Sequence, residues 1–185
     1  MFNLIFQSVT SLILIIYLIF IVFDMLDFLI TKVPPLPTAS SVIPFLLKEM
    51  ENQPKKVFID LGCGNGKVLL AVKKRYPEIQ VIGYEKWPTQ FLMAKVKNLL
   101  KGTKAKIFCK DLFQADLKNA DIVFSFLMPV LMERLGNKLK EELKSGALII
   151  SNSFSLGNDW KPIKIIQTGK NPKSTFGSLF IYKKD

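Results

Sequence analysis

Three glycines at alternate positions follow an apolar stretch that ends on an acid, within the segment Phe58–Leu70 (FIDLGCGNGKVLL). Gly62, Gly64 and Gly66 lack a Cβ, so the backbone there can turn tightly and come within contact of a ligand. A strand, a glycine turn and a helix in this order are typical of a nucleotide-like cofactor site. Dinucleotide sites carry G-x-G-x-x-G, whereas Lys67 stands where the last glycine would fall. The spacing therefore argues against a dinucleotide.

Two further acids end the next two expected strands. Glu85 closes the run VIGYE, 23 residues after Gly62, and Asp111 lies in FCKDLF. Ligands of open α/β sheets lie outside the carboxyl ends of the strands, where an acid accepts hydrogen bonds from ribose hydroxyls. Asp111 can accept from an adenine amino group, with the backbone N–H of Leu112 facing the ring. Each acid alone is as readily a helix cap or an ion pair, but with Asp60 the three in order predict a ligand that contains adenosine.

The elements that must position these residues alternate along the chain. Strands are expected over 56–62, 79–85, 105–111, 120–127, 147–153, 163–169 and 178–184, and helices over 66–76, 88–102 and 129–146. Another helix is expected to begin at Ser40 or Ser41, which can cap it. Strands that alternate with helices of this length indicate βαβ units and a largely parallel sheet. The last two strands bracket a turn and would add an antiparallel edge.

The first 30 residues have a different character. Leu4–Phe23 holds 20 residues without a charge, which is enough for a helix to cross the ~30 Å hydrocarbon core. No Lys or Arg precedes Lys32, so the basic leader of a signal peptide is missing; a buried core helix is the other alternative. We expect a retained anchor over 1–30, a proline-rich linker over 31–41 and a soluble domain over 42–185.

The charges predict an orientation and raise a question about the end of the anchor. All 26 Lys and Arg follow the span, which favours an outside N-terminus and a cytoplasmic domain. Asp24 and Asp27 lie one turn apart where the span ends. They form either a polar face at headgroup level or a contact with a partner membrane protein.

Composition excludes several classes of function. The chain has no histidine, so it can form neither a Ser-His-Asp triad nor a His-ligated zinc site. Cys63 and Cys109 are too few and too far apart for a metal motif, and we expect reduced thiols and no metal. The net charge of +11 comes almost wholly from lysine and is weak evidence for a nucleic-acid partner.

The motifs resemble those of a known superfamily. DLGCGNG at 60–66, Glu85 and Asp111 are similar to the cofactor motifs of class I S-adenosylmethionine-dependent methyltransferases. VPPLPT, GYE, KDLF and VFSFLMPVLMERLGNKLKEEL resemble a small group of lysine methyltransferases with soluble archaeal members and membrane-anchored mitochondrial members that act on inner-membrane proteins. The resemblance implies a Rossmann-like class I methyltransferase fold: a mainly parallel seven-stranded sheet with an antiparallel C-terminal hairpin strand and helices on both faces, preceded by one transmembrane helix.

The resemblance also implies roles for residues around S-adenosylmethionine. Asp60 would brace the glycine loop, Gly62 and Gly64 would present backbone groups to the methionine end, Glu85 would hold the ribose and Asp111 the adenine. Lys86 replaces the apolar residue that is usual in the family, and its aliphatic stem could cover the adenine face. The expected cofactor-binding residues are Asp60, Gly62, Cys63, Gly64, Gly66, Glu85, Lys86, Asp111 and Leu112.

The acceptor side is less defined. Candidate substrate residues are Pro37, Thr38, Ser125, Phe126 and Leu127, and no general base is assigned. The fourth strand ends in SFLMP, unlike the Asn or Asp, two prolines and an aromatic of enzymes that methylate nucleobase amino groups or glutamine amides. We therefore predict a membrane-anchored lysine methyltransferase of a membrane or membrane-associated protein. The alternatives are a methyltransferase of a lipid headgroup or lipophilic small molecule, and a non-catalytic module that binds S-adenosylmethionine.

Overall fold

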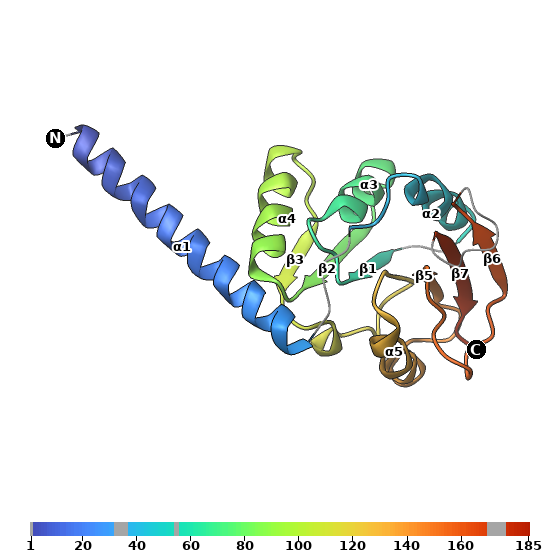
Figure 1. The fold of residues 1–185 in the computed structure, drawn as a ribbon. Helices are drawn as coiled ribbons and strands as arrows, with labels where there is room; N and C mark the ends of the chain where they lie inside the picture. The colour runs from blue at the N-terminus through green and yellow to red at the C-terminus, as the bar shows by residue number, and fades with distance from the viewer. Residues whose placement is uncertain (1, 32–36, 54–55, 170–176) are drawn as a thin grey trace.

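A single seven-stranded sheet organises the domain. The computed structural model describes residues 2–31, 37–53, 56–169 and 177–185, and its strands lie in the order β3-β2-β1-β4-β5-β7-β6 (Figure 1). Their bounds are β1 Val57–Leu61, β2 Gln80–Glu85, β3 Lys106–Cys109, β4 Ile122–Ser125, β5 Leu148–Asn152, β6 Lys164–Gln167 and β7 Ser178–Lys183. Strands β1 to β5 pair in parallel, and β7 is antiparallel to both β5 and β6. This confirms the predicted sheet; the expected turn between its last two strands falls on 170–176, outside the described residues.

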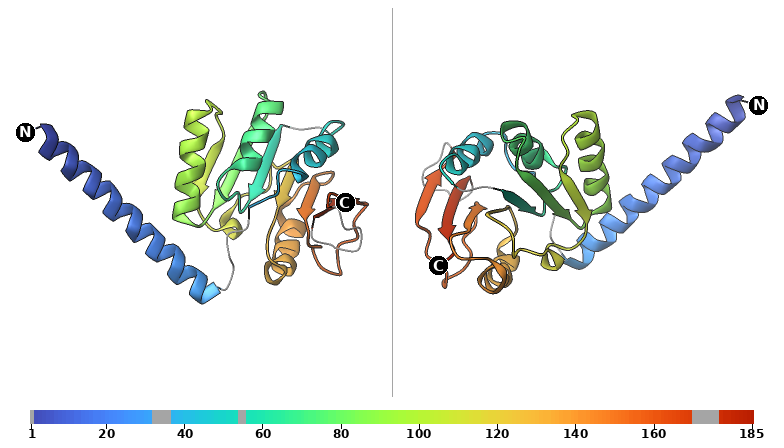
Figure 2. Two further views of the ribbon diagram at one scale, coloured as in Figure 1. Left: turned by 45° about the horizontal axis from the view of Figure 1, so that its top comes forward. Right: turned by 180° about the vertical axis from the view of Figure 1, so that it is seen from behind.

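Helices cover both faces of the sheet, as predicted (Figure 2). The helices are α1 Phe2–Thr31, α2 Val42–Met50, α3 Lys67–Arg75, α4 Pro88–Leu100 and α5 Pro129–Glu142, with a short 3-10 helix η1 Leu112–Gln114. Apolar residues of α2, α3 and α4 share one core cluster, and those of α5 share the other. Neighbouring residues Phe58 and Ile59 of β1 enter opposite clusters, because side chains alternate across a strand.

The predicted cap of α2 is wrong in its detail. Ser41 is the N-cap residue, but its backbone is helical (φ −63°, ψ −24°) and its side chain makes no capping hydrogen bond. A capping side chain needs extended backbone to reach back to the first amides. Here the amides of Val42 and Ile43 donate to the carbonyls of Ala39 and Ser40, at 3.2 and 3.3 Å, so a backbone turn begins the helix.

Helix α1 projects away from the domain (Figure 1). Its stretch Ile5–Leu26 is long and apolar enough to cross a membrane, and none of its most apolar window is buried, so the alternative of a buried core helix is wrong. The C-terminal part of α1 lies beside α4, and the two helices diverge from there, as Figures 1 and 2 show. At that contact the Thr89 hydroxyl donates to the Asp24 carboxyl group, so Asp24 binds within its own chain. Residues 32–36 of the predicted linker lie outside the described residues.

Candidate active site

The strand order reverses at β1, which lies between β2 and β4, and the carboxyl ends of these strands border a cavity. Its volume of about 540 Å³ is within the range of roughly 300–1,000 Å³ that is usual for small-molecule sites. A crevice at this switch point is the expected ligand site of an open α/β sheet. The cavity is lined by Pro37, Gly62, Gly64, Asn65, Tyr84, Glu85, Lys86, Trp87, Gln90, Met93, Asp111, Leu112, Phe113, Phe126, Leu127, Met128, Val130, Leu131, Arg134 and Phe154.

Glu85 ties the end of β2 to the glycine loop. Its Oε2 accepts the amide of Gly64 at 2.7 Å, and its Oε1 accepts the amide of Trp87 at 2.8 Å. Burial raises the pKa of this carboxyl group, although the two amides act in the opposite direction. Each carboxylate oxygen has about two lone-pair sites, so each keeps one for a ligand hydroxyl. The group therefore fits the two hydroxyls of a ribose.

The glycine loop uses its amides internally. Gly62 and Cys63 both donate to the carbonyl of Tyr84 at 2.9 Å, and Gly66 donates to Cys63 at 3.0 Å, while Gly64 donates to Glu85. The N–H groups of Gly62 and Gly64 therefore already have acceptors within the chain, and the expectation that these two residues present backbone groups to the methionine end of a cofactor stays a prediction. What these two residues can offer a ligand is their carbonyl oxygens, which suit an ammonium group.

A second, small cavity of about 20 Å³ borders the same loop and shares Pro37, Gly62, Gly64 and Asn65 with the large one. Asp60, Cys63, Thr38 and Lys67 are among its lining residues, and the Lys67 ammonium donates to the Thr38 carbonyl at 3.0 Å. Burial, with a smaller contribution from the charge of Glu85, raises the pKa of Asp60. Burial also raises the pKa of the Cys63 thiol, which disfavours the thiolate that a nucleophilic cysteine needs. Within the described part of the chain, no group of three or more Cys, Asp or Glu is arranged to hold a metal.

Asp111 and its neighbours form the third side of the large cavity. The Asp111 carboxyl group accepts the amide of Phe113 at 2.8 Å and caps η1, and Leu112 lines the cavity beside it. The Lys86 ammonium lies 5.7 Å from the centre of the Trp87 ring. Lys86 therefore reaches the cavity wall with its cation directed to an aromatic ring, and its contact with an adenine stays a prediction.

The candidate substrate residues divide between the two cavities. Pro37, Phe126 and Leu127 line the large one, and Thr38 lines the small one with Pro37. Ser125 lines neither; it is fully buried, and its hydroxyl has no partner among the described residues. Gly66 also lines neither: a Cβ on it would lie 3.0 Å from the Cβ of Ala94 in α4. Gly66 is placed to let the loop pack against α4.

Aromatic residues form much of the wall, and the sequence reasoning missed most of them. Trp87, Phe113, Phe126 and Phe154 each lie within four residues after the end of β2, β3, β4 or β5, and all line the cavity. The Arg134 guanidinium of α5 lies 3.8 Å from the centre of the Phe113 ring and closes one side. The sequence did offer a signal for this wall, because an aromatic residue follows soon after each of these four strands. The carboxyl ends of parallel strands meet at one edge of the sheet, so these residues come together there.

Comparison with known proteins agrees with this geometry. The family model for the ANTKMT methyltransferase domain matches residues 60–164. A protein-lysine N-methyltransferase of Saccharolobus islandicus is 29% identical over 138 residues, which are 73% of this chain and 84% of that protein. The adenine nucleotide translocase lysine N-methyltransferase of Mus musculus is 29% identical over 140 residues, which are 75% of this chain and 60% of that protein. The match thus spans less than two thirds of the mouse protein.

The fold agrees as well. The crystal structure of an RNA methyltransferase from Salinibacter ruber, in complex with S-adenosyl-L-homocysteine, superposes with a TM-score of 0.70 at 23% identity. The match covers 80% of this chain and 93% of that one, and identity at this level shows the fold alone. The family match covers more than half of the sequence, and the chain therefore belongs to the ANTKMT methyltransferase domain family of class I S-adenosylmethionine-dependent methyltransferases.

Proposed function

We propose that this chain is an S-adenosylmethionine-dependent protein-lysine N-methyltransferase that acts on a membrane or membrane-associated protein. The observation that carries the proposal is the junction at Glu85. One buried carboxyl group bridges the glycine loop and the start of α4 at the wall of the large cavity, and Asp111 lines the same cavity. The two named relatives are lysine methyltransferases, which supports lysine as the acceptor.

The residues present suit each part of the cofactor. Glu85 would take the ribose hydroxyls, and Asp111 with Leu112 would take the adenine edge. The carbonyls of Gly62 and Gly64 and the buried Asp60 would face the cationic methionine ammonium. Lys67 lies in the small cavity beside Asp60 and would pair with the methionine carboxylate. The bound cofactor supplies a methyl group on a sulfonium, so the protein mainly contributes position and orientation.

The aromatic part of the cavity suits a lysine acceptor. A lysine must lose its proton before it can accept a methyl group, and burial among apolar groups favours the neutral amine. Trp87, Phe126 and Phe154 line the wall, and their rings also favour the methylated ammonium product through cation–π contacts. Burial raises the pKa of the Cys63 thiol, which supports direct transfer to the acceptor without a covalent enzyme intermediate.

The proposal assigns α1 to the membrane. Ile5–Leu26 has the length and composition of a span, and the mouse relative is by its name a methyltransferase of adenine nucleotide translocase, which is a membrane protein. The lysines all follow this helix, which supports an outside N-terminus and a cytoplasmic catalytic domain. The anchor would comprise residues 1–30, the linker 31–41 and the catalytic domain 42–185.

Cofactor binding tests the first half of the proposal. We would titrate the full chain in detergent micelles with S-adenosylmethionine by calorimetry and compare Glu85→Gln with Glu78→Gln. Glu85→Gln breaks the bridge to one amide, and a hydrogen bond to a charged group contributes about 1.5–3 kcal/mol, so affinity should fall about tenfold or more. Glu78 is exposed and precedes the amino end of β2, whereas the cavity lies at the carboxyl ends of the strands. Its variant should therefore bind the cofactor like the native chain. Native protein that shows no affinity would refute the enzymatic function.

Methyl transfer to membranes tests the second half. Membranes from the cells that make this protein would be incubated with the full chain and methyl-radiolabelled cofactor, then separated into protein and lipid. We expect label in protein, recovered as methyl-lysine after acid hydrolysis and absent with Glu85→Gln. Label confined to the lipid extract would instead support a lipid methyltransferase, and binding without any transfer would support a non-catalytic module.

A further inference from the structure

The outward side of α4 carries an apolar stripe that the domain does not cover. Leu92, Met93, Val96, Leu100 and Leu99 are exposed to 40, 41, 47, 77 and 81%, and we call them the α4 stripe. Their spacing places them on one face of the helix, opposite the buried Ala94. A helix face that meets water is normally polar, so an exposed stripe of this size indicates a contact surface.

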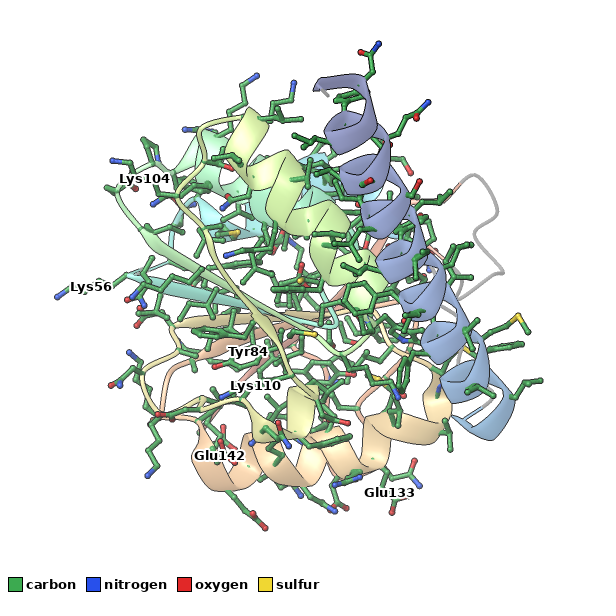
Figure 3. All side chains as sticks on the ribbon, turned by 90° about the vertical axis from the view of Figure 1, so that its left-hand side faces the viewer. Lys56, Tyr84, Lys104, Lys110, Glu133 and Glu142 are labelled. Atoms are coloured by element: carbon green, nitrogen blue, oxygen red, sulfur yellow. The ribbon has the colours of Figure 1, made fainter. Side chains whose placement is uncertain are left out.

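Lysines flank the stripe on both sides. Lys95 and Lys97 are the neighbours of Val96 in sequence, so on a helix they lie about 100° to either side of it. Lys101 and Lys104 follow the end of α4 and are exposed. Figure 3, which views the molecule from the side of α1, shows Lys104 to one side of α4, in the connection that leads to β3. A helix with a central apolar face and flanking lysines is typical of one that lies in a bilayer interface, with its ammonium groups at the headgroups.

The stripe begins where α1 is attached to the domain. Thr89 precedes Leu92 by one helical turn, and its hydroxyl donates to Asp24 of α1. From this contact the two helices diverge (Figures 1 and 2), and exposure along the stripe rises from 40% at Leu92 to 81% at Leu99. The stripe therefore faces the space beside α1, whose own apolar side chains are exposed all along Ile5–Leu26.

We propose that the α4 stripe lies against the same lipid bilayer that α1 crosses, with the flanking lysines at anionic headgroups. The proposal rests on the proposed assignment of α1 as a membrane span. Lipid is the occupant that the structure favours, because α4 is fixed to α1 at Asp24 and both helices present apolar side chains to one region. Met93 and Gln90 of α4 also line the large cavity, so this contact would open the cavity beside the membrane surface.

Spin labels can measure the surroundings of the stripe directly. The full chain would carry Cys109→Ser, which removes the exposed native thiol, and one labelled cysteine at a time: Leu99→Cys or Val96→Cys in the stripe. Ile16→Cys is the reference in the span, and Ile163→Cys is the matched control, since Ile163 is 65% exposed beside the opposite edge strand β6. Each protein would be reconstituted in vesicles of phosphatidylcholine and phosphatidylglycerol, and collisions with oxygen and with a water-soluble nickel complex would be compared.

The expected result is a ratio of oxygen to nickel collisions at Leu99 and Val96 several-fold above that at Ile163 and close to that at Ile16. Water-like ratios at both stripe positions, with a lipid-like Ile16, would overturn the contact and leave the span standing. Water-like ratios at all sites would overturn the span and the contact together. Low collision with both reagents and spin–spin broadening would show a second copy of the chain on the stripe, which also overturns the proposal. Cofactor affinity of each labelled protein reports separately on folding and on the proposed function.

Discussion

Replacing Gly66 with alanine measures how tightly the glycine loop is packed against α4. The backbone of Gly66 is left-handed, with a φ of +77°, and an added Cβ would lie 3.0 Å from the Cβ and 3.3 Å from the Cα of Ala94. Gly64 is the matched control, because its φ is also positive, +52°, while a Cβ there would meet nothing within 4 Å. The two substitutions share the backbone strain and differ in the collision.

The magnitude follows from these two contributions. A left-handed conformation costs an alanine about 1–2 kcal/mol, and this applies at both positions. Overpacking adds about 1–3 kcal/mol, and only Gly66 has a neighbour close enough for it. The free energy of unfolding should therefore fall by about 1–2 kcal/mol in Gly64→Ala and by about 2–5 kcal/mol in Gly66→Ala.

The assay is urea unfolding of the full chain in detergent micelles, followed by the fluorescence of Trp87 and Trp160. The double variant Gly66→Ala with Ala94→Gly removes the nearest colliding atom. Glycine within a helix costs about 1 kcal/mol by itself, so the double variant should be more stable than the sum of the single effects by about 0.5–3 kcal/mol. Equal losses in Gly66→Ala and Gly64→Ala, or strict additivity in the double variant, would refute the packing role. A loss of S-adenosylmethionine affinity at unchanged stability would indicate instead that Gly66 contacts the cofactor.

Three further predictions concern charged and polar groups. Cofactor binding should release protons and strengthen as pH rises through the raised pKa of Glu85. Burial raises the pKa of this carboxyl group, whereas ribose hydroxyls and a cationic ligand favour its charged form and lower the pKa again. Calorimetry in buffers of different ionisation heat would detect the released protons, and proton uptake would contradict this prediction. Asp24→Asn and Thr89→Val should each destabilise the contact of α1 with α4 by about 1.5–3 kcal/mol. The double variant should lose no more than one of the single variants loses. Additive losses in this double-mutant cycle would count against the hydrogen bond. Desolvation raises the pKa of Asp121, but hydrogen bonds from Lys144 and two amides outweigh it, so the pKa is lowered overall. The stability that Asp121 contributes is therefore complete above the pKa of the unfolded state and is lost as pH falls through the lowered pKa of the folded state. Asp121→Asn should make the free energy of unfolding depend less on pH in the acid range. An unchanged dependence there would show that these hydrogen bonds contribute nothing.

Residues at strand ends were predictable, because periodicity places the strands and parallel pairing brings their carboxyl ends to one edge. By this reasoning Glu85, Asp111 and Leu112 were expected at one ligand site, and all three line the large cavity. The use of the loop amides was not predictable, since the acceptors of Gly62 and Gly64 are the Tyr84 carbonyl and the Glu85 carboxylate. Those contacts depend on how closely the loop approaches β2, and no local pattern encodes that distance.

The sequence by itself determined the order of strands and helices, the apolar N-terminal span and the three acids of the site. These depend on hydrophobic period, on the glycine spacing and on charge, all of which are local along the chain. Only the tertiary structure decided that aromatic residues from four strand ends form one wall and that Gly66 serves packing against Ala94. The tertiary structure also decided that Asp24 contacts Thr89, 65 residues away. It likewise decided that the α4 stripe stays uncovered beside α1. Contacts between distant residues follow from how elements pack, so they are fixed only when the chain is folded.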